Sequence, residues 1–231
     1  APCPVPVKHA MIDWLGPIIE EFYAGSEGNG HVMISSAEWL ARPGSVGRAV
    51  IGQLHICDDD GNELPVGETG TIYFGGGRAI DYHNDPVKSA AARNPKHPEW
   101  TTMGDVGHVD NEGYLYLSDR KDFMIISGGV NIYPQEVENL LLNHPDVADA
   151  AVFGVPNAVF GEEVKAVIQL KNPEHASDAI ATTLINWCRE RLADVKCPRS
   201  VDFERELPRA DTGKLYKKEL KARYWPVIPT E

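Results

Sequence analysis

The stretch from Gly104 to Pro134, GDVGHVDNEGYLYLSDRKDFMIISGGVNIYP, most constrains the fold of this chain. Within it, the alternating residues 114–117 and the apolar residues 123–126 are typical of β-strands. Four consecutive charged residues, 119–122, separate these two segments. A hydrophobic core does not require such a tetrad. Between two strands it indicates a turn, a hinge or a contact with a ligand.

Size and charge narrow the classes of protein that this chain can represent. Its 231 residues, 42% of them hydrophobic, can form one large domain or two small ones with real cores. A net charge of −12 argues against a nucleic-acid-binding surface, which is basic over a whole domain. A small molecule that carries phosphate is still compatible, because it needs only a local basic patch.

Cysteine usage and apolar runs indicate the compartment. The four cysteines, Cys3, Cys57, Cys188 and Cys197, lie far apart, without a Cys-x-x-Cys pair or a nearby histidine at metal spacing. We therefore expect free thiols in the reducing cytoplasm. No apolar run approaches the roughly twenty residues of a membrane span, and no secretory signal is visible. The absence of an initiator Met suggests that residue 1 is not a natural N-terminus.

The first half of the chain predicts a β-rich unit. Residues 5–15 predict a short amphipathic helix that ends at Gly16-Pro17, and residues 18–23 predict a buried strand. From about residue 32 to 117, closely spaced turn signals separate short strands, a pattern typical of a barrel-like or sandwich-like unit.

After Ser118 the pattern predicts a small α+β unit. We expect strands at 123–126, 147–155, 164–170 and 201–203, and helices from Pro134, at about 177–194 and at 215–224. Ser177-Asp178 is a plausible cap for the long helix. The chain thus combines α/β and α+β parts, its units meet near residues 119–122, and its tail, 226–231, is expected to be loose.

Two glycine-containing segments admit two interpretations each. Ala24, Gly25, Ser26 and Glu27 open a loop directly after a predicted strand, where ligand groups are common in α/β folds, although an exposed turn explains the same residues. Gly128-Gly129 lets a narrow ligand pass close to the backbone, or forms a simple hairpin turn.

The C-terminal segment is basic within an acidic chain. Residues 209–223 contain six basic side chains and two acidic ones, a local balance of +4. Lys214 lies at the tip of a Thr-Gly turn just before the last predicted helix. The segment either contacts an anionic ligand or is a solvated helix with its lysines in water.

Four local sequences, in this order, carry a family resemblance. They are residues 23–27, residues 102–105, residues 119–122 together with 127–129, and residues 208–214. With this order and spacing, the chain closely resembles the C-terminal part of the adenylate-forming enzymes, which include acyl-CoA synthetases, peptide-synthetase adenylation domains and firefly luciferase. The sequence of residues 104–134 most resembles that of the fatty-acyl-CoA ligases.

This resemblance implies a two-step reaction on a carboxylic acid, expected to be a fatty acid. ATP and Mg²⁺ would give an acyl-adenylate and pyrophosphate, and coenzyme A would then displace AMP. By the same resemblance, Tyr23 would stack on adenine, Ala24 and Gly25 would adjoin the nucleotide, Ser26 would contact the α-phosphate and Glu27 would hold magnesium.

The resemblance also implies roles for the later motifs. Asp105 and Arg120 would bind the ribose hydroxyls, Asp122 would be a hinge, and Gly128-Gly129 would admit the pantetheine arm. Lys214 would bridge carboxylate and phosphate in the first step. Ala24 and Ser26 stand where the family usually has glycine and threonine. Because serine keeps the hydroxyl, we expect its contact to survive. Ala210, where threonine is frequent, has no interpretation.

The resemblance covers only part of an adenylating enzyme. The Ser/Thr/Gly-rich phosphate loop of the family is absent from these residues, so we expect the chain to need an N-terminal part of the same enzyme. Residues 1–118 would end the large domain and residues 119–231 would form the mobile small domain; a homo-oligomer is also compatible. Two alternatives stay open: an enzyme that loads a carrier protein or another acceptor, and a non-catalytic module that keeps the fold.

Overall fold

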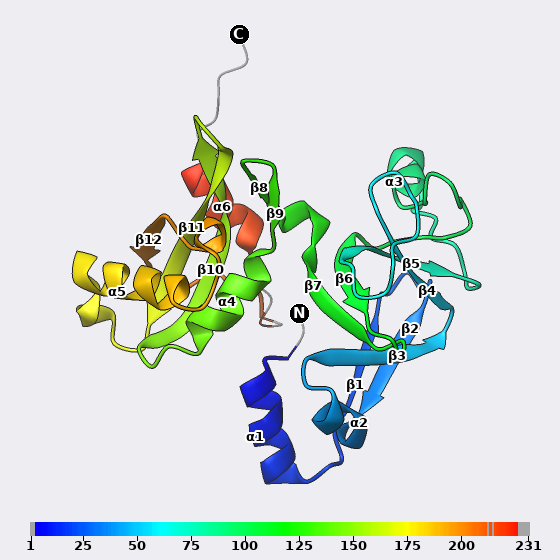
Figure 1. The fold of residues 1–231 in the computed structure, drawn as a ribbon, viewed down its shortest axis with the longest axis horizontal. Helices are drawn as coiled ribbons and strands as arrows, with labels where there is room; N and C mark the ends of the chain where they lie inside the picture. The colour runs from blue at the N-terminus through cyan, green and yellow to red at the C-terminus, as the bar shows by residue number, and fades with distance from the viewer. Residues whose placement is uncertain (1–2, 212, 214, 226–231) are drawn as a thin grey trace. The chain divides into compact units, whose positions relative to one another are not determined.

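The computed structural model describes residues 3–211, 213 and 215–225 of the chain. Its internal contacts divide the chain into two compact units, Ala1–Asp122 (unit 1) and Phe123–Glu231 (unit 2) (Figure 1). Each unit has its own sheet and its own buried core.

Unit 1 is built on one antiparallel sheet. Its helices are α1 (Val5–Leu15), α2 (Ser36–Ala41) and α3 (Pro86–Ala91), and its strands are β1 (Glu20–Ala24), β2 (His31–Ser35), β3 (Ser45–Ile51), β4 (Gln53–Cys57), β5 (Gly70–Gly75), β6 (Asp105–Val109) and β7 (Leu115–Arg120). The described strands follow the order β1-β2-β3-β7-β6-β5-β4, with β1 and β4 at its two ends. The predicted β-rich unit is thus confirmed as an open sheet and not as a closed barrel.

The strand predicted at residues 18–23 was wrong in position and burial. β1 begins at Glu20, and Ile18 and Phe22 are 74% and 67% exposed. Since β1 is an edge strand, only alternate residues such as Tyr23 turn toward the core. An apolar run does not reveal whether its strand is central or at an edge, which is why the sequence misled here.

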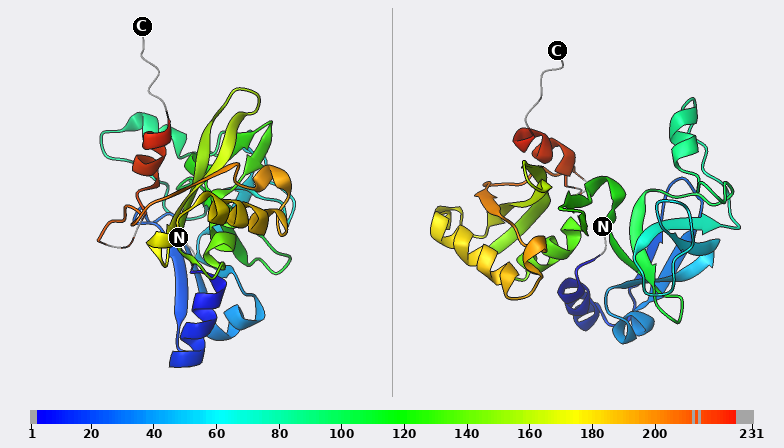
Figure 2. Two further views of the ribbon diagram at one scale, coloured as in Figure 1. Left: turned by 90° about the vertical axis from the view of Figure 1, so that its left-hand side faces the viewer. Right: turned by 45° about the horizontal axis from the view of Figure 1, so that its top comes forward.

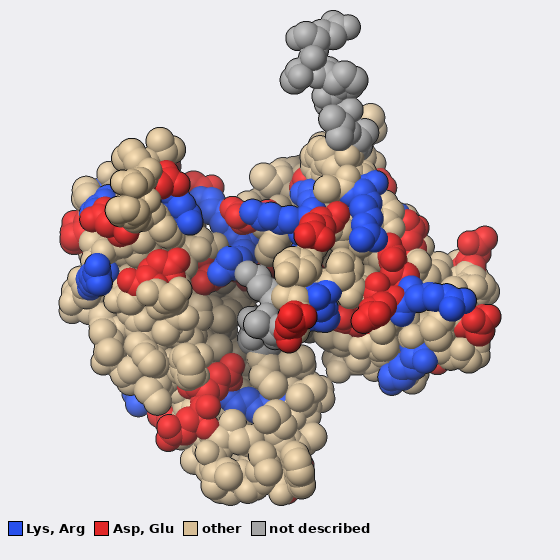
Figure 3. All heavy atoms as spheres, turned by 180° about the vertical axis from the view of Figure 1, so that it is seen from behind, with Lys and Arg blue, Asp and Glu red and all other residues tan. Residues whose placement is uncertain are grey.

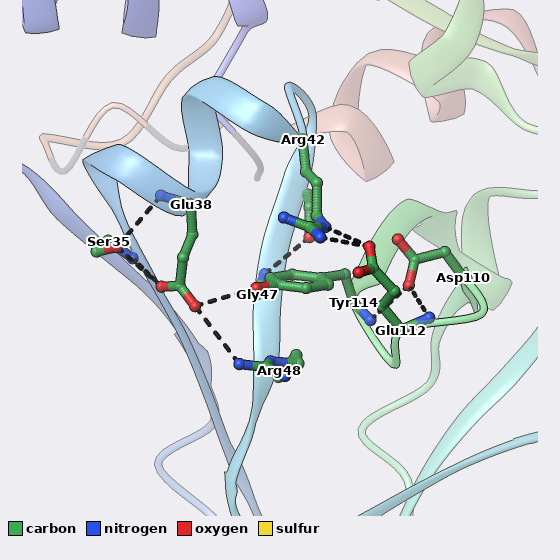
Figure 4. A network of polar contacts seen from close by, with 9 residues as sticks. Ser35, Glu38, Arg42, Gly47, Arg48, Asp110, Glu112 and Tyr114 are labelled. Atoms are coloured by element: carbon green, nitrogen blue, oxygen red, sulfur yellow. Dashed lines mark hydrogen bonds and ion pairs between the residues drawn. The ribbon is translucent and has the colours of Figure 1, made fainter.

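Helix α2 begins where a side chain satisfies its first amide groups (Figure 4). The Ser35 hydroxyl accepts a bond from the Glu38 amide, and the Glu38 carboxylate accepts from the Ser35 amide, a capping box. Glu38 also accepts a 3.0 Å bond from the Tyr114 hydroxyl. The guanidinium groups of Arg42 and Arg48 lie 4.1 and 4.8 Å from the centre of the Tyr114 ring. This network joins α2 to β3 and to the start of β7.

Unit 2 alternates hairpins and helices. Its elements are η1 (Lys121–Phe123), which bridges the unit boundary, β8 (Ile125–Ser127), β9 (Val130–Ile132), α4 (Pro134–Leu142), β10 (Val147–Asn157), β11 (Gly161–Leu170), η2 (Pro173–His175), α5 (Asp178–Arg189), η3 (Asp194–Lys196), β12 (Ser200–Phe203) and α6 (Lys217–Tyr224). The sheet runs β10-β11-β8-β9, and β12 pairs in parallel with β11.

The two faces of this sheet pack against different helices (Figures 1 and 2). Ala150 and Val152 of β10 belong to a core shared with α4 and α5, whereas Ala151 and Phe153 belong to one that includes Leu220 of α6. Because successive side chains of a strand point to opposite faces, α4 and α5 cover one face and α6 covers the other.

The predicted helices of unit 2 are confirmed, but two of their ends differ. Ser177 caps α5 as expected by accepting a bond from the Ile180 amide, yet α5 ends at Arg189 with Glu190 as its C-cap, and residues 194–196 form a separate 3₁₀ turn. Helix α6 begins at Lys217, since Leu215 instead pairs with Arg209 in an isolated β-bridge. The tail 226–231, predicted to be loose, lies outside the described residues.

No helix in the described ranges combines the length and apolar character needed to cross a membrane. All four cysteines, at positions 3, 57, 188 and 197, are described and free, as expected.

Candidate active site

A hydrogen bond in unit 1 joins two motifs that lie 82 residues apart. The Tyr23 hydroxyl, from the end of β1, donates to Asp105 Oδ2 at 2.7 Å, at the start of β6. The Tyr23 ring also packs beside Phe74, with ring centroids 6.2 Å apart. Burial, followed by the charge of Asp105, raises the pKa of Tyr23 strongly, so Tyr23 stays a neutral donor.

Arg120 reaches the same carboxylate from the neighbouring strand. Asp105 and Arg120 are direct partners in the β6–β7 register, and Arg120 Nε donates to Asp105 Oδ1 at 3.1 Å. Asp105 is mostly buried, whereas about half of the Arg120 side chain is exposed. The carboxylate is therefore oriented from two sides, and the guanidinium retains an exposed surface that can contact a ligand.

The loop after β1 lies against the segment before β6. A Cβ added to Gly25 would lie 1.9 Å from the sulfur of Met103, so this close approach requires glycine. The Gly28 amide donates to the Gly25 carbonyl and closes the turn. Ser26 Oγ lies 3.5 Å from Glu27 Oε2. These residues do form a turn, as one of the two interpretations predicted. The turn lies next to the Met103–Asp105 segment.

Tyr82 is a residue of this site that the sequence did not predict. Its hydroxyl donates to Glu27 Oε1 at 3.2 Å, and Lys88 of α3 lies 3.8 Å from the centre of its ring. Burial, and next the charge of Glu27, raises the pKa of Tyr82. Its place in the sequence, shortly after the triple glycine Gly75–Gly77, is not specific enough to mark it.

Glu27 is the residue in this site that suits a metal ion. Among residues 3–211, 213 and 215–225, no group of three or more His, Cys, Asp or Glu could hold a metal by itself. Mg²⁺ is usually held by one or two carboxylates together with waters and substrate phosphates. A single accessible carboxylate fits that mode of binding and does not fit a site built from protein ligands alone.

Asp122 is the last residue of unit 1. It lies in η1, directly after the strand that carries Arg120. The neighbouring Lys121 amide donates to the Gly104 carbonyl, and Lys121 Nζ pairs with Asp59. The chain is thus anchored to unit 1 up to the residue that precedes Asp122.

Gly128 and Gly129 form the tight turn of the β8–β9 hairpin. Their φ angles are +57° and +81°, a region that side chains disfavour and two-residue hairpin turns require. The Gly128 amide donates to the Phe160 carbonyl at 2.9 Å. The turn interpretation of the pair is therefore correct, and a role toward pantetheine stays a prediction.

Thr212 and Lys214 lie outside the described residues, but the residues around them are held firmly. The Arg209 guanidinium makes two 2.7 Å bonds to the carboxylate of Asp149. The Gly213 amide donates to the Ala210 carbonyl at 2.7 Å. Arg209 is thus fixed to β10, on which Asp149 lies.

Several described cations of the basic C-terminal segment have acidic partners. Four of its described cations are paired within unit 2: Arg209 with Asp149, Lys217 with Glu138, Lys221 with Glu162 and Arg223 with Glu204. On the face drawn in Figure 3, blue and red side chains accordingly alternate over unit 2. A sequence does not show which acids face these cations, and contact of this segment with an anionic ligand stays a prediction.

The two units therefore contribute separate sets of residues. Unit 1 brings Tyr23, Asp105 and Arg120 into one bonded group, with Ser26 and Glu27 alongside; Ala24 ends β1, paired with His31. Of the residues predicted in unit 2, Gly128 and Gly129 lie in a hairpin turn, and Lys214 lies outside the described residues.

Comparisons with known proteins agree with the motifs. Residues 136–214 match the model of the AMP-binding enzyme C-terminal domain. The chain is 34% identical over 201 residues to the long-chain-fatty-acid–CoA ligase FadD13 of Mycobacterium tuberculosis, covering 87% of this chain and 39% of that protein. It is 40% identical over 190 residues to indoleacetate–CoA ligase of Aromatoleum aromaticum, covering 81% and 36%.

A solved structure aligns over nearly the whole chain. The o-succinylbenzoate CoA synthetase of Bacillus subtilis, in complex with its acyl-adenylate intermediate, superposes with a TM-score of 0.80 and 32% identity, over 96% of this chain and 44% of that one. The chain spans less than half the length of each of these relatives. It belongs to the adenylate-forming enzymes and corresponds to their C-terminal portion.

Proposed function

We propose that this chain supplies the nucleotide-facing and thioester-forming C-terminal residues of an AMP-forming acyl-CoA ligase. In the reaction, a carboxylate attacks the α-phosphate of ATP to give acyl-AMP and pyrophosphate. The thiol of coenzyme A then attacks the acyl carbon and releases AMP. A fatty acid is the favoured substrate class, because the sequence of residues 104–134 most resembles that of fatty-acyl-CoA ligases.

The bonded group of Tyr23, Asp105 and Arg120 is the observation that carries this proposal. A carboxylate can accept from two hydroxyl groups at once, and a diol such as ribose offers two. Arg120 orients that carboxylate and retains donors for the sugar. The planar Tyr23 ring, fixed by its hydroxyl and by Phe74, suits contact with a flat base.

The loop of Ser26 and Glu27 would serve the phosphates. The Ser26 hydroxyl would donate to an α-phosphate oxygen, and Glu27 would hold Mg²⁺, with Tyr82 orienting the carboxylate. The metal ion, when bound, would neutralise charge on the phosphate oxygens. Ser26 and Glu27 contribute by position, since phosphoryl-transfer enzymes act mainly through placement and electrostatics.

The residues of unit 2 would act in turn. Lys214 would bridge the acid and the phosphate during adenylation, and Gly128-Gly129 would line the path of pantetheine during thioester formation. A rotation at Asp122 would exchange them. We assign residues 1–118 to the end of a large domain and residues 119–231 to the small mobile domain, acting together with an upstream N-terminal part and in the cytoplasm.

Two other functions would leave much of this chain unchanged. An adenylating enzyme that loads a carrier protein would keep the nucleotide residues and differ in its acceptor. A non-catalytic module would keep the fold and lose the need for Lys214. A homo-oligomer is compatible with all three, and nothing in unit 1 or unit 2 favours it.

The test uses the full-length enzyme with acids of graded length and with aromatic acids. We expect acid-dependent ATP–pyrophosphate exchange and, with free coenzyme A, a thioester. Exchange without any thioester would favour the carrier-loading enzyme. Lys214→Ala should abolish exchange while the protein remains folded, and unchanged activity in that variant would favour the non-catalytic module.

A further inference from the structure

Glu162 joins two elements of unit 2 that come from distant parts of the chain. Its Oε2 accepts a 3.0 Å bond from the Ile126 amide of β8, and its Oε1 pairs with Lys221 Nζ of α6 at 3.3 Å. The Glu162 side chain is only 18% exposed. One carboxylate on β11 is thus shared by the β8–β9 hairpin and the C-terminal helix.

The backbone next to Glu162 leaves space for this carboxylate. Gly154 lies on the neighbouring strand β10, and a Cβ added there would lie 2.7 Å from both Cδ and Oε2 of Glu162. Any side chain at position 154 would therefore displace the carboxylate. This steric requirement is independent of the hydrogen bond and the ion pair, and it concerns the same group.

The β8–β9 hairpin needs such an anchor. Each of its strands has three residues, and an isolated two-stranded hairpin is marginally stable at best. Ile125 and Ile132 are fully buried at its base, but Ile126 and Val130, nearer the turn, are 51% and 42% exposed. Burial therefore fixes the base of the hairpin and leaves its tip to polar contacts.

The polar contacts near the tip come from the turn between β10 and β11. Gly161 pairs with Ser127, and the Phe160 carbonyl accepts from the Gly128 amide. Glu162 adds the contact with a charged acceptor, and a bond to an ionised group is stronger than one between neutral groups. The position of Gly128 thus depends on residues 160–162.

We propose that Glu162 is a positioning residue that holds the β8–β9 hairpin, with Gly128-Gly129 at its tip, in a fixed place relative to α6. The proposal rests on the proposed function only in its consequence for the thioester step. The hairpin would be presented to the pantetheine arm in one orientation, and Lys221 would couple that orientation to the helix that follows Lys214.

The first experiment needs no substrate. Amide hydrogen exchange is measured in the 231-residue chain, with Val152 as a reference in the core. Glu162→Ala should accelerate exchange at Ile126 and Gly128 by about tenfold or more relative to Val152, because a bond to a charged acceptor is lost. Glu162→Gln retains an acceptor oxygen and should change exchange less than about threefold.

The neighbouring residue on β11 provides a matched control. Glu163 bonds to the Asn157 side chain, so Glu163→Ala should leave exchange at Ile126 unchanged. If Glu162→Ala does not fold, Gly154→Ala displaces the same carboxylate and should accelerate the same amides. Unchanged exchange at Ile126 in the folded variant, or equal acceleration by Glu163→Ala, would overturn the proposal.

The second experiment separates this proposal from the proposed function. In the full-length enzyme, Glu162→Ala should slow thioester formation about tenfold more than acyl-adenylate formation, a difference that general instability would not produce. Equal loss in both half-reactions would overturn the positioning role. An enzyme that forms no thioester in its unmodified state, while Glu162→Ala still accelerates exchange at Ile126, contradicts the proposed function and supports the hairpin anchor.

Discussion

In unit 1, Tyr23, Asp105 and Arg120 bond to one another, whereas in unit 2 Gly128 bonds to a residue outside the motifs. Tyr23 and Arg120 both donate to Asp105, and the β6–β7 register places two of these three residues side by side. In unit 2 the Gly128 amide donates to the Phe160 carbonyl, and Arg209 is bonded to Asp149. Side chains on paired strands can orient one another, whereas residues in turns need contacts from other elements to fix their positions.

This difference predicts where substitutions act. Changes in unit 1 should affect function directly, with modest effects on stability. Changes to the supports of unit 2 should affect stability or geometry first. The predictions below follow from this contrast, and the largest effect is expected for a buried ion pair.

Lys217→Met should strongly destabilise unit 2. Lys217 and Glu138 form a 2.6 Å ion pair with both side chains less than a tenth exposed. Removal of one partner from a buried pair leaves an uncompensated charge and costs about 3–5 kcal/mol. Urea unfolding of the 231-residue chain measures this loss of free energy.

A second substitution tests the cause of that loss. Glu138 also accepts a bond from the Val152 amide at 2.7 Å, and glutamine can keep that bond. Lys217→Met combined with Glu138→Gln should therefore recover most of the stability. A double variant as unstable as the single one would show that packing, and not the unpaired charge, is responsible.

Asp105→Ala should reduce adenylation in the full-length enzyme by roughly a hundredfold, because it removes the acceptor proposed for ribose and releases Tyr23 and Arg120. Pyrophosphate exchange measures the effect. Asp60→Ala, an exposed aspartate in the turn after β4, is the control and should be silent. An unfolded Asp105→Ala protein, in place of a folded and slow enzyme, would contradict the separation of function from stability in unit 1.

The sequence predicted the helices and strands of this fold better than the side-chain contacts around them. Periodicity identified α1 and the strands β10, β11 and β12, but it placed one strand at 123–126, where β8 spans Ile125–Ser127, and it gave no strand for β9. The order of the motifs predicted that Asp105 and Arg120 act together, and the β6–β7 register pairs them. It did not identify Tyr82, because a lone tyrosine after glycines has no specific pattern. Nor did it identify the ion pairs of the C-terminal segment, because Glu138 lies 79 positions before Lys217 and only tertiary structure brings them together.

Gly25→Ala tests the close packing of the loop after β1. The new methyl group would overlap the Met103 sulfur and approach the Glu27 carboxylate, so these side chains or the loop must shift, at a cost of about 1–3 kcal/mol. We expect adenylation to fall by roughly tenfold. Met103→Ala in the same protein makes room and should restore part of the activity.

A second glycine of the same loop separates packing from backbone strain. Gly28 has a φ of +71° and no heavy atom within 4 Å of an added Cβ. Gly28→Ala should therefore cost only about 1 kcal/mol through backbone strain, and Met103→Ala should not rescue it. Equal rescue of both variants would refute the steric explanation.

The smallest effect concerns pH and the cap of α2. Bonds from the Ser35 amide and hydroxyl, followed by the Tyr114 hydroxyl, hold the pKa of Glu38 below its usual value. A lowered folded-state pKa stabilises the protein above the unfolded-state pKa of about 4.3, and this contribution is lost as pH falls through the folded value.

Because the Glu38 side chain is 38% exposed, we expect this contribution to stability to be less than about 1 kcal/mol. Glu38→Gln should therefore be less stable than the unmodified chain at pH 7, with the difference shrinking between about pH 5 and 3, as urea midpoints would measure. The exposed Glu68→Gln should show no such change with pH, and a Glu38→Gln deficit that persists undiminished at low pH would mean that the cap acts through geometry and not through charge.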